Sequence, residues 1–322
     1  MLSPKSAAQA AESFNLRLER LMPVMTPVGV LLGFAFPLAF IRLRPFIPWL
    51  FSAMTLSGAL KLRLRDLGRA LADPFPLILF FVSAHVIIPL LVFLPCSLVF
   101  RNDPDTVSGY VLLFSVPTAV SGFIWVSIYR GDGALALALI FLDTLLTPLV
   151  VPGTVSALLG TAVALDIGGV AFSLMGMVVL PTITGVAAHE ISRGKIPPAV
   201  TPYLNPFSKF CIVLVIGANA SAVAPRVDPA DPKVWVIALL SVVFAAFGYG
   251  FSRLAGIAAG LAPEKRTTLF FAAGLRNLSA ATTIAIEYFP ATAALPALLG
   301  IVFQQTLAAV MGRVCLSGHR KR

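Results

Sequence analysis

Long apolar runs separated by short polar segments dominate the chain. Each is bounded by charged residues, proline or glycine, and ten can be counted, at residues 21–41, 46–60, 75–99, 107–128, 133–158, 167–188, 203–224, 233–256, 267–287 and 293–314. Most approach the length of about 20 residues that an α-helix needs to cross the hydrocarbon core of a bilayer. The alternating pattern of an outer-membrane barrel is absent from the sequence. The pattern therefore predicts an all-α membrane protein with ten transmembrane helices.

Composition agrees with this prediction. The 322 residues are 58% hydrophobic and only 12% charged, whereas about a quarter of a soluble domain is charged. A net charge of +10 would suggest nucleic acid as the partner of a soluble protein, but here we attribute it to basic cytoplasmic loops. Cys96, Cys211 and Cys315 show no paired spacing, so we expect neither a disulfide framework nor a metal site. We expect no cofactor and no nucleic acid.

One membrane domain should account for most of the chain. We expect a cytoplasmic segment at residues 1–20, a single ten-helix domain at 21–314 and a basic cytoplasmic tail at 315–322. The first segment is too polar for a cleavable signal peptide. An even number of spans puts both termini on one side of the membrane, and that side collects 18 of the 24 lysines and arginines. The positive-inside rule then predicts cytoplasmic termini, and the protein should be a multi-pass protein of an inner (plasma) membrane.

Two spans are interrupted at equivalent positions in the two halves of the chain. The halves are residues 21–158 and 167–314, and five spans in each predict an inverted repeat. The fourth span contains Pro117 and Gly122, and the ninth contains Gly274-Leu-Arg-Asn277. Paired breaks mark the central site of a secondary transporter, where exposed helix N-termini suit an anion.

Three ionisable residues lie at membrane depth. Arg276 costs about 2.5–3.5 kcal/mol there on insertion scales, so it indicates a transport pathway or a binding site more often than a packing ion pair. Its forked guanidinium suits a substrate carboxylate. Asp143 is the obvious partner of Arg276, and the alternatives are a neutral core residue or a proton-coupling carboxylate. His85 is either a core residue or a proton acceptor near neutral pH.

Four further polar residues are candidates for contact with a substrate. Thr118 and Ser121 lie beside the break in the fourth span, where they either contact substrate or satisfy carbonyls that the break frees. Gln304 and Gln305 lie in the apolar tenth span, where they either line the cavity or bond across helices.

The chain resembles the bile acid:sodium symporter family over nearly its whole length. The resemblance rests on four stretches in the family's order, which are residues 54–66, residues 83–90, Tyr129–Asp132 with Asp143–Pro148, and Pro263–Arg266 with Gly274–Asn277. It implies ten helices in a panel and a core subdomain, with discontinuous helices four and nine crossing where they unwind. It also implies alternating access for an organic anion driven by sodium, and it places Asn277 beside the substrate.

The family's sodium ligands are missing at the matching positions. The family uses Glu, Gln, Ser, Asn and Thr side chains, and the positions are occupied here by Ala272, Arg276, Gly122, Phe123, Ala136, Ile140 and Ala84. Hard cations need oxygen ligands, and a guanidinium repels Na⁺ where little water screens the charge. We therefore expect Arg276 to act as a built-in cation in place of sodium.

The leading hypothesis is a secondary transporter that moves a small organic anion across the bilayer without sodium, coupled to protons through Asp143 or His85 or acting by facilitated diffusion. A conventional sodium symporter with displaced ligands is the first alternative. Two others rank lower: an arsenite or auxin carrier of related architecture, and a non-transporting sensor. We expect no enzyme, since the sequence has neither a His-Glu-x-x-His motif nor a serine elbow.

Overall fold

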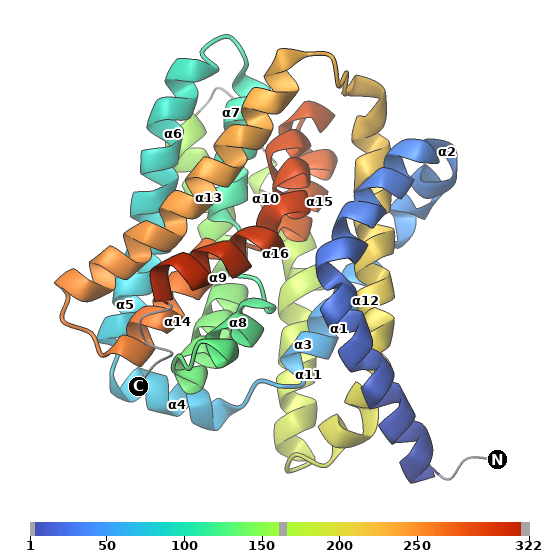
Figure 1. The fold of residues 1–322 in the computed structure, drawn as a ribbon, viewed down its shortest axis with the longest axis vertical. Helices are drawn as coiled ribbons and strands as arrows, with labels where there is room; N and C mark the ends of the chain where they lie inside the picture. Colours follow the sequence, from blue (N-terminus) through green and yellow to red (C-terminus); the bar gives the residue numbers. More distant parts are fainter. Residues whose placement is uncertain (1–3, 161–165, 317–322) are drawn as a thin grey trace. The chain divides into compact units, whose positions relative to one another are not determined.

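The computed structural model describes residues 4–160 and 166–316 (Figure 1). Their secondary structure is helical, apart from one isolated β-bridge. The chain divides into two compact units. Unit 1 is formed by Met1–Leu64 and Ser173–Ala224, and unit 2 is formed by Arg65–Phe172 and Pro225–Arg322.

Unit 1 is organised around a long helix pair. Helix α1 runs along α12 (Figure 1), and small residues bring the two close together. A Cβ on Gly33 would lie 2.2 Å from the carbonyl oxygen of Gly217, so no larger residue fits this contact. The elements of this unit are α1 (Pro4–Ala35), α2 (Pro37–Phe40), η1 (Ile41–Phe46), α3 (Ile47–Ala59), η4 (Met175–Val179), α11 (Leu180–Ile191) and α12 (Ile196–Val223).

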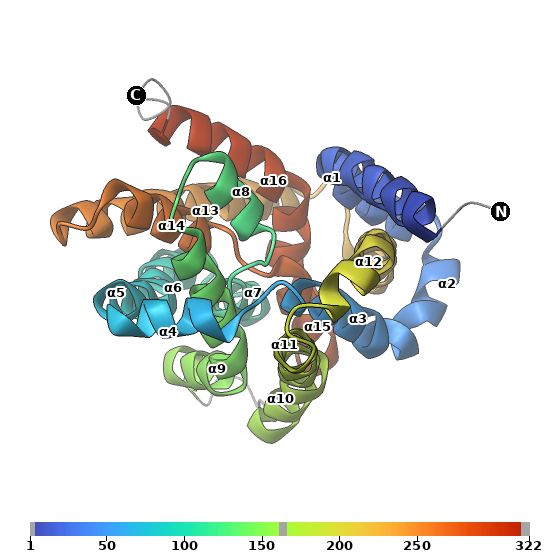
Figure 2. The same cartoon turned by 90° about the horizontal axis from the view of Figure 1, so that it is seen from below.

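Unit 2 contains both interrupted spans. Helix α13 packs against α14 and α16, and α7 packs against α6 and α9 (Figure 2). Its elements are α4 (Leu64–Ala72), α5 (Phe75–Val82), η2 (Ser83–Ile87), α6 (Ile88–Val99), α7 (Pro104–Ser115), α8 (Gly122–Ile128), α9 (Gly133–Leu159), α10 (Ile167–Leu174), η5 (Ala224–Arg226), α13 (Pro232–Ala258), α14 (Pro263–Gly274), α15 (Leu278–Tyr288), η6 (Ala291–Ala294) and α16 (Leu295–Leu316).

Aspartates begin three of the long helices. The side chains of Asp103, Asp132 and Asp231 accept hydrogen bonds from backbone N–H groups in the first turns of α7, α9 and α13. A carboxylate at the N-cap satisfies a donor that the helix leaves unpaired, and it also suits the positive end of the helix dipole. Proline follows the cap in α7 and α13, at the position where its missing N–H is not needed.

Two π-helical turns precede prolines. The turn η2 comes just before Pro89, and the turn η4 comes just before Pro181. Proline has no N–H with which to close the preceding α-helical turn, and a π-turn accommodates the missing bond without ending the helix. Phe75–Val99 and Ile167–Ile191 therefore each remain one long helical span.

Helices occupy all ten of the predicted runs. In the described residues, six helices are long and apolar enough to cross a membrane, or seven if the pair that is bent by 100° around Phe36 counts as one span. The total of ten spans and the inverted repeat stay predictions. Helix α1 begins at Pro4 and so extends into the predicted cytoplasmic segment of residues 1–20, whose location stays a prediction. Of the predicted basic tail, residues 317–322 lie outside the described residues.

Both predicted helix breaks are present. Helix α7 ends at Ser115, and Val116 is extended at ψ 157° because the residue before Pro117 is excluded from the helical conformation. The next helix, α8, begins only at Gly122. Helix α14 ends at Gly274 and α15 begins at Leu278. Gly274 packs directly on a tyrosine, since a Cβ there would lie 2.2 Å from the ring of Tyr249.

Candidate functional site

The two helix breaks contact each other through their backbones. The N–H of Ala119 donates to the carbonyl of Leu275, and the N–H of Asn277 donates to the carbonyl of Pro117, both at 2.8 Å. Thr118 and Arg276 thereby form an antiparallel β-bridge. Backbone groups that lose their helical partners at the breaks are paired across them instead, as burial in an apolar environment requires.

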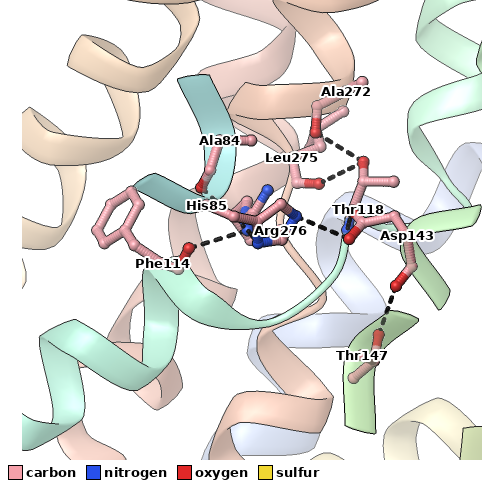
Figure 3. Close-up of polar contacts among 9 residues, drawn as sticks. All are labelled: Ala84, His85, Phe114, Thr118, Asp143, Thr147, Ala272, Leu275 and Arg276. Carbon is pink, nitrogen blue, oxygen red and sulfur yellow. Dashed lines mark hydrogen bonds and ion pairs between the residues drawn. The ribbon is translucent and has the colours of Figure 1, made fainter. Parts of the chain in front are cut away.

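Thr118 satisfies two further carbonyls at this crossing. Its hydroxyl donates to the carbonyl of Ala272 at 2.7 Å and to that of Leu275 at 3.1 Å (Figure 3). The residue is 2% exposed. Of the two roles considered for Thr118 from the sequence, the contacts match the satisfaction of carbonyls that the break frees.

Arg276 places its guanidinium inside the crossing. Its Nη2 donates to the carbonyl of Phe114 at 2.9 Å and lies 3.5 Å from the carbonyl of Ala84 (Figure 3). Phe114 belongs to the last turn of α7, where unpaired carbonyls give the helix a negative end that favours a cation. The side chain is almost fully buried, with 3% of the residue exposed.

His85 lies between Arg276 and Asp143. Its Nε2 is 2.8 Å from Asp143 Oδ1, which is ion-pair distance without hydrogen-bond geometry, and its Nδ1 is 3.4 Å from Arg276 Nη2. Asp143 Oδ2 accepts the backbone N–H of Thr118 at 2.7 Å. The direct Arg276–Asp143 pair expected from the sequence is therefore not formed, because an imidazole intervenes.

A largely apolar cavity of unit 2 is bordered by Arg276 and Gln304. Its other lining residues include Leu113, Phe303 and Leu307. Gln304 Nε2 donates to the backbone carbonyl of Arg276. The Nε and Nη1 atoms of Arg276 have no hydrogen-bond partner among the described residues. A buried guanidinium with free donors is suited to bind an anion.

The other predicted substrate-contact residues, Asn277, Gln305 and Ser121, differ in their contacts around this site. Asn277 caps α15 by accepting the N–H of Ala280 at 3.2 Å, and its side chain is half-buried. Gln305 Oε1 accepts the indole N–H of Trp125 at 3.0 Å and so joins α16 to α8. Ser121 stands at the start of α8 without a side-chain capping bond.

Six of the seven positions that the resemblance matched to the family's sodium ligands hold apolar residues, and the seventh is Arg276. Ala84, Ala136, Ile140 and Ala272 are buried, as is Gly122, while Phe123 is half-buried. Two of their backbone oxygens already face donors, since the carbonyl of Ala84 faces Arg276 and that of Ala272 accepts the Thr118 hydroxyl. The carbonyls of Ala84 and Phe114 belong to the site, although no side-chain pattern could have indicated them. Tyr249 also lines the cavity, and its place was equally invisible in the sequence.

Two broken apolar helices that meet at their breaks over buried charges define a membrane transporter rather than an enzyme. Comparison with known proteins then gives the family. The sequence profile of the sodium bile acid symporter family matches residues 47–227. This match covers more than half of the chain, so the chain belongs to that family and is a multi-pass secondary transporter.

The relatives of the chain agree with this assignment. The chain is 35% identical to the uncharacterized protein YbaS of Bacillus subtilis over 291 residues, which cover 90% of this chain and 95% of the relative. It is 25% identical to the probable sodium/metabolite cotransporter BASS1, chloroplastic, of Arabidopsis thaliana, over 96% of this chain and 77% of the relative. The uncharacterized sodium-dependent transporter YocS of Bacillus subtilis is 24% identical over 60% of each chain.

Proposed function

We propose that this transporter moves a small organic anion by alternating access without sodium, and that Arg276 stands in the place of the ion. The observation that carries the proposal is the bond from the guanidinium to the carbonyl at the end of α7, at 2.9 Å. A cation at this point neutralises the negative end of a broken helix, which is a task that a bound metal ion can also perform.

The contacts of the oxygen atoms near Arg276 support the proposal that no sodium ion binds there. Sodium needs several oxygen ligands, and a carboxylate normally supplies the compensating charge. Asp143 is the carboxylate at hand, but one of its oxygens faces His85 and the other accepts a backbone N–H. One oxygen is therefore occupied by a donor of the chain, and the other lies at ion-pair distance from the imidazole.

The substrate proposal rests on the charge and lining of the same region. Arg276 offers unpaired N–H donors to an anion, and Gln304 borders the same cavity. Leu113, Phe303 and Leu307 suit the apolar body of an organic molecule. Asn277, Ser121, Thr118 and Gln305 stay candidates for contact with the substrate in other conformations of the cycle. Transport by facilitated diffusion and transport coupled to protons both fit this proposal.

One alternative has support from the comparisons. Two of the relatives described above carry sodium in their names, one as a probable sodium/metabolite cotransporter and one as a sodium-dependent transporter. A conventional sodium symporter would need ligands displaced from the positions that the family uses. The experiment below separates the two functions.

The test compares the melting midpoint of the purified protein in sodium, potassium and choline chloride at equal ionic strength. Selective binding of an ion at 100 times its dissociation constant adds about 2.7 kcal/mol to the stability, which is a readily measured shift. We expect no difference among the three salts for the wild-type chain. The double variant Ala272→Glu, Arg276→Gln restores two ligand types and should become more stable in sodium than in potassium.

The single variant Arg276→Gln is the matched control, because it removes the cation without adding a carboxylate. It should lose stability equally in all three salts. A sodium-dependent shift in the wild-type protein would establish the symporter alternative and remove Arg276 from its proposed role.

A further inference from the structure

We propose that His85 Nδ1 is the proton site of this carrier, and that a proton bound there releases Arg276 to bind the carboxylate of the substrate. Proton and anion would then bind together. This inference rests on the proposed function, because it takes Arg276 as the cation of the transport site. It adds the atom that carries the proton and the step that links the proton to the substrate.

The contacts of His85 favour one tautomer of the neutral ring in the described conformation. A guanidinium can only donate, so His85 Nδ1 accepts from Arg276 Nη2 at 3.4 Å. The single ring proton is then on Nε2, which lies 2.8 Å from Asp143 Oδ1. The imidazole then lies between a guanidinium and a carboxylate. A second proton can enter only at Nδ1, where it takes the place of the Arg276 contact.

Asp143 is a poorer proton acceptor than His85 in this arrangement. Its Oδ2 accepts the backbone N–H of Thr118 at 2.7 Å, and its Oδ1 lies 2.8 Å from His85 Nε2. One oxygen of this carboxylate is therefore already occupied by a backbone donor. Of the two contacts of the His85 ring, the one between Nδ1 and Arg276 Nη2 is the weaker. It is longer, and the same Nη2 also donates to the carbonyl of Phe114 at 2.9 Å.

Protonation of Nδ1 turns an accepting contact into a repulsive one. The imidazolium and the guanidinium then face each other as two cations in a buried site, which favours displacement of the guanidinium. The Nε and Nη1 donors of Arg276 are already without partners among the described residues. A carboxylate that binds this fork restores the charge balance: one proton and one anion enter a site whose Arg276 and Asp143 charges already cancel.

Among the described residues, Asp143 and Arg276 are the titratable groups at hydrogen-bond or ion-pair distance from His85. From α5, the rings of Phe80 and Phe81 pack on the imidazole, with centroids 6.0 and 5.7 Å away. Helix α9 contributes Asp143, and the break between α14 and α15 contributes Arg276. Among the described residues, α6, α7 and α13 give His85 no partner at hydrogen-bond or ion-pair distance. The proton therefore has one acceptor, flanked by one cation and one anion.

The first test measures the ring nitrogens of His85 by NMR on the full-length protein labelled with ¹⁵N-histidine. We expect the neutral tautomer with its proton on Nε2 at alkaline pH, and a second proton on Nδ1 as the pH falls. His189 is the internal control, because its Nδ1 lies 3.0 Å from the carbonyl of Leu60 and must carry a proton in order to donate. The variants His85→Asn and His189→Asn assign the signals.

Charge variants make this test specific. In Arg276→Gln, His85 should take up its second proton at a higher pH than in the wild type, since a neighbouring cation is gone. In Asp143→Asn, it should do so at a lower pH. An Nδ1–H tautomer for neutral His85, or a titration that neither variant moves, would overturn the inference without bearing on sodium.

The second test measures anion binding with potassium acetate, potassium pyruvate and potassium benzoate as probes, each against potassium chloride. Binding of a probe should take up one proton, so its affinity should weaken about tenfold for each pH unit above the pH at which His85 is half-protonated. His85→Asn should bind the probe with the same affinity at every pH. Binding that is independent of pH in the wild type would refute the proton step while leaving sodium-free anion transport standing. If no probe binds at any pH, substrate binding by a simple carboxylate is wrong, and the NMR titration still decides the proton site.

Discussion

Arg276 connects more parts of the crossing than any other residue. Its backbone pairs with Thr118, its carbonyl accepts from Gln304, and its guanidinium reaches a carbonyl of α7 and the ring of His85. A cation at such depth is stable only where its surroundings supply acceptors. Backbone carbonyls and the imidazole of His85 lie at hydrogen-bond distance here, and Asp143 lies on the other side of that imidazole.

A substitution of Thr118 gives a testable prediction at the scale of a single residue. The change Thr118→Val keeps the shape of the side chain but removes the hydroxyl that donates to the carbonyls of Ala272 and Leu275. Leaving a buried carbonyl without its donor costs about 1–3 kcal/mol, so we expect a loss of that size in the free energy of unfolding in detergent. Chemical denaturation measures it.

Two controls accompany this change. Thr118→Ser keeps the hydroxyl and should recover most of the lost stability. Ser127→Ala removes an exposed hydroxyl that bonds only to a carbonyl of its own helix, and it should change stability by less than about 0.5 kcal/mol. Equal effects of Thr118→Val and Ser127→Ala would show that the hydroxyl of Thr118 does not support the crossing.

The identity of the buried ionisable residues was predictable, and their partners were not. Arg276, Asp143 and His85 stand out in the sequence because charged or titratable groups are rare in apolar spans. The position of His85 between the other two depends on the π-turn of Ser83–Ile87. An extra residue in one turn rotates the following side chains by about 100° around the helix axis, so α-helical spacing alone could not place the ring.

At the scale of secondary-structure elements, the two interrupted helices define the architecture of the crossing. Pro117 predicts the first break directly, since the residue before a proline leaves the helical conformation. The second break has no proline, and it follows a residue in close contact: Gly274 sits against the ring of Tyr249, 25 positions earlier in the chain. Local sequence indicates where such a break is permitted, while the contact that requires the glycine is visible only in the structure.

Gly274→Ala tests this contact. Its Cβ would lie 2.2 Å from a carbon of the Tyr249 ring, and a forced shift of a packed ring costs about 1–3 kcal/mol. We expect a loss of stability of that size, measured by denaturation. Gly250→Ala is the matched control on α13, because no heavy atom lies within 4 Å of the added Cβ, and it should be neutral or slightly stabilising.

A double-mutant cycle isolates the pair. In a Tyr249→Ala background the clash is absent, so Gly274→Ala should cost much less there than in the wild-type chain. A cost that is the same in both backgrounds would mean that the glycine is needed for its backbone conformation rather than for its contact with the ring.

At the scale of the whole molecule, the distribution of lysine and arginine predicts the orientation of the protein in the membrane. The predicted cytoplasmic side carries 18 of the 24 lysines and arginines, among them Lys61, Arg130 and Arg266. We expect a green fluorescent protein fused after residue 322 to fluoresce and an alkaline phosphatase fused there to be inactive. Fusions after residue 228, in a predicted outer loop, should give the reverse pattern. An active phosphatase at residue 322 would show that the termini face outward.

The proposed role of Arg276 as a built-in cation has a thermodynamic consequence for the transport cycle. A sodium ion that binds on one side and leaves on the other performs work, because it moves down its own gradient. A guanidinium returns with the carrier to its starting point, so over a complete cycle it contributes no free energy at all. In this proposed role, Arg276 replaces the ion as a structural element, but it cannot supply the free energy that drives transport. A carrier of this design accumulates its substrate only if another gradient drives it, or if the cell consumes the substrate on arrival.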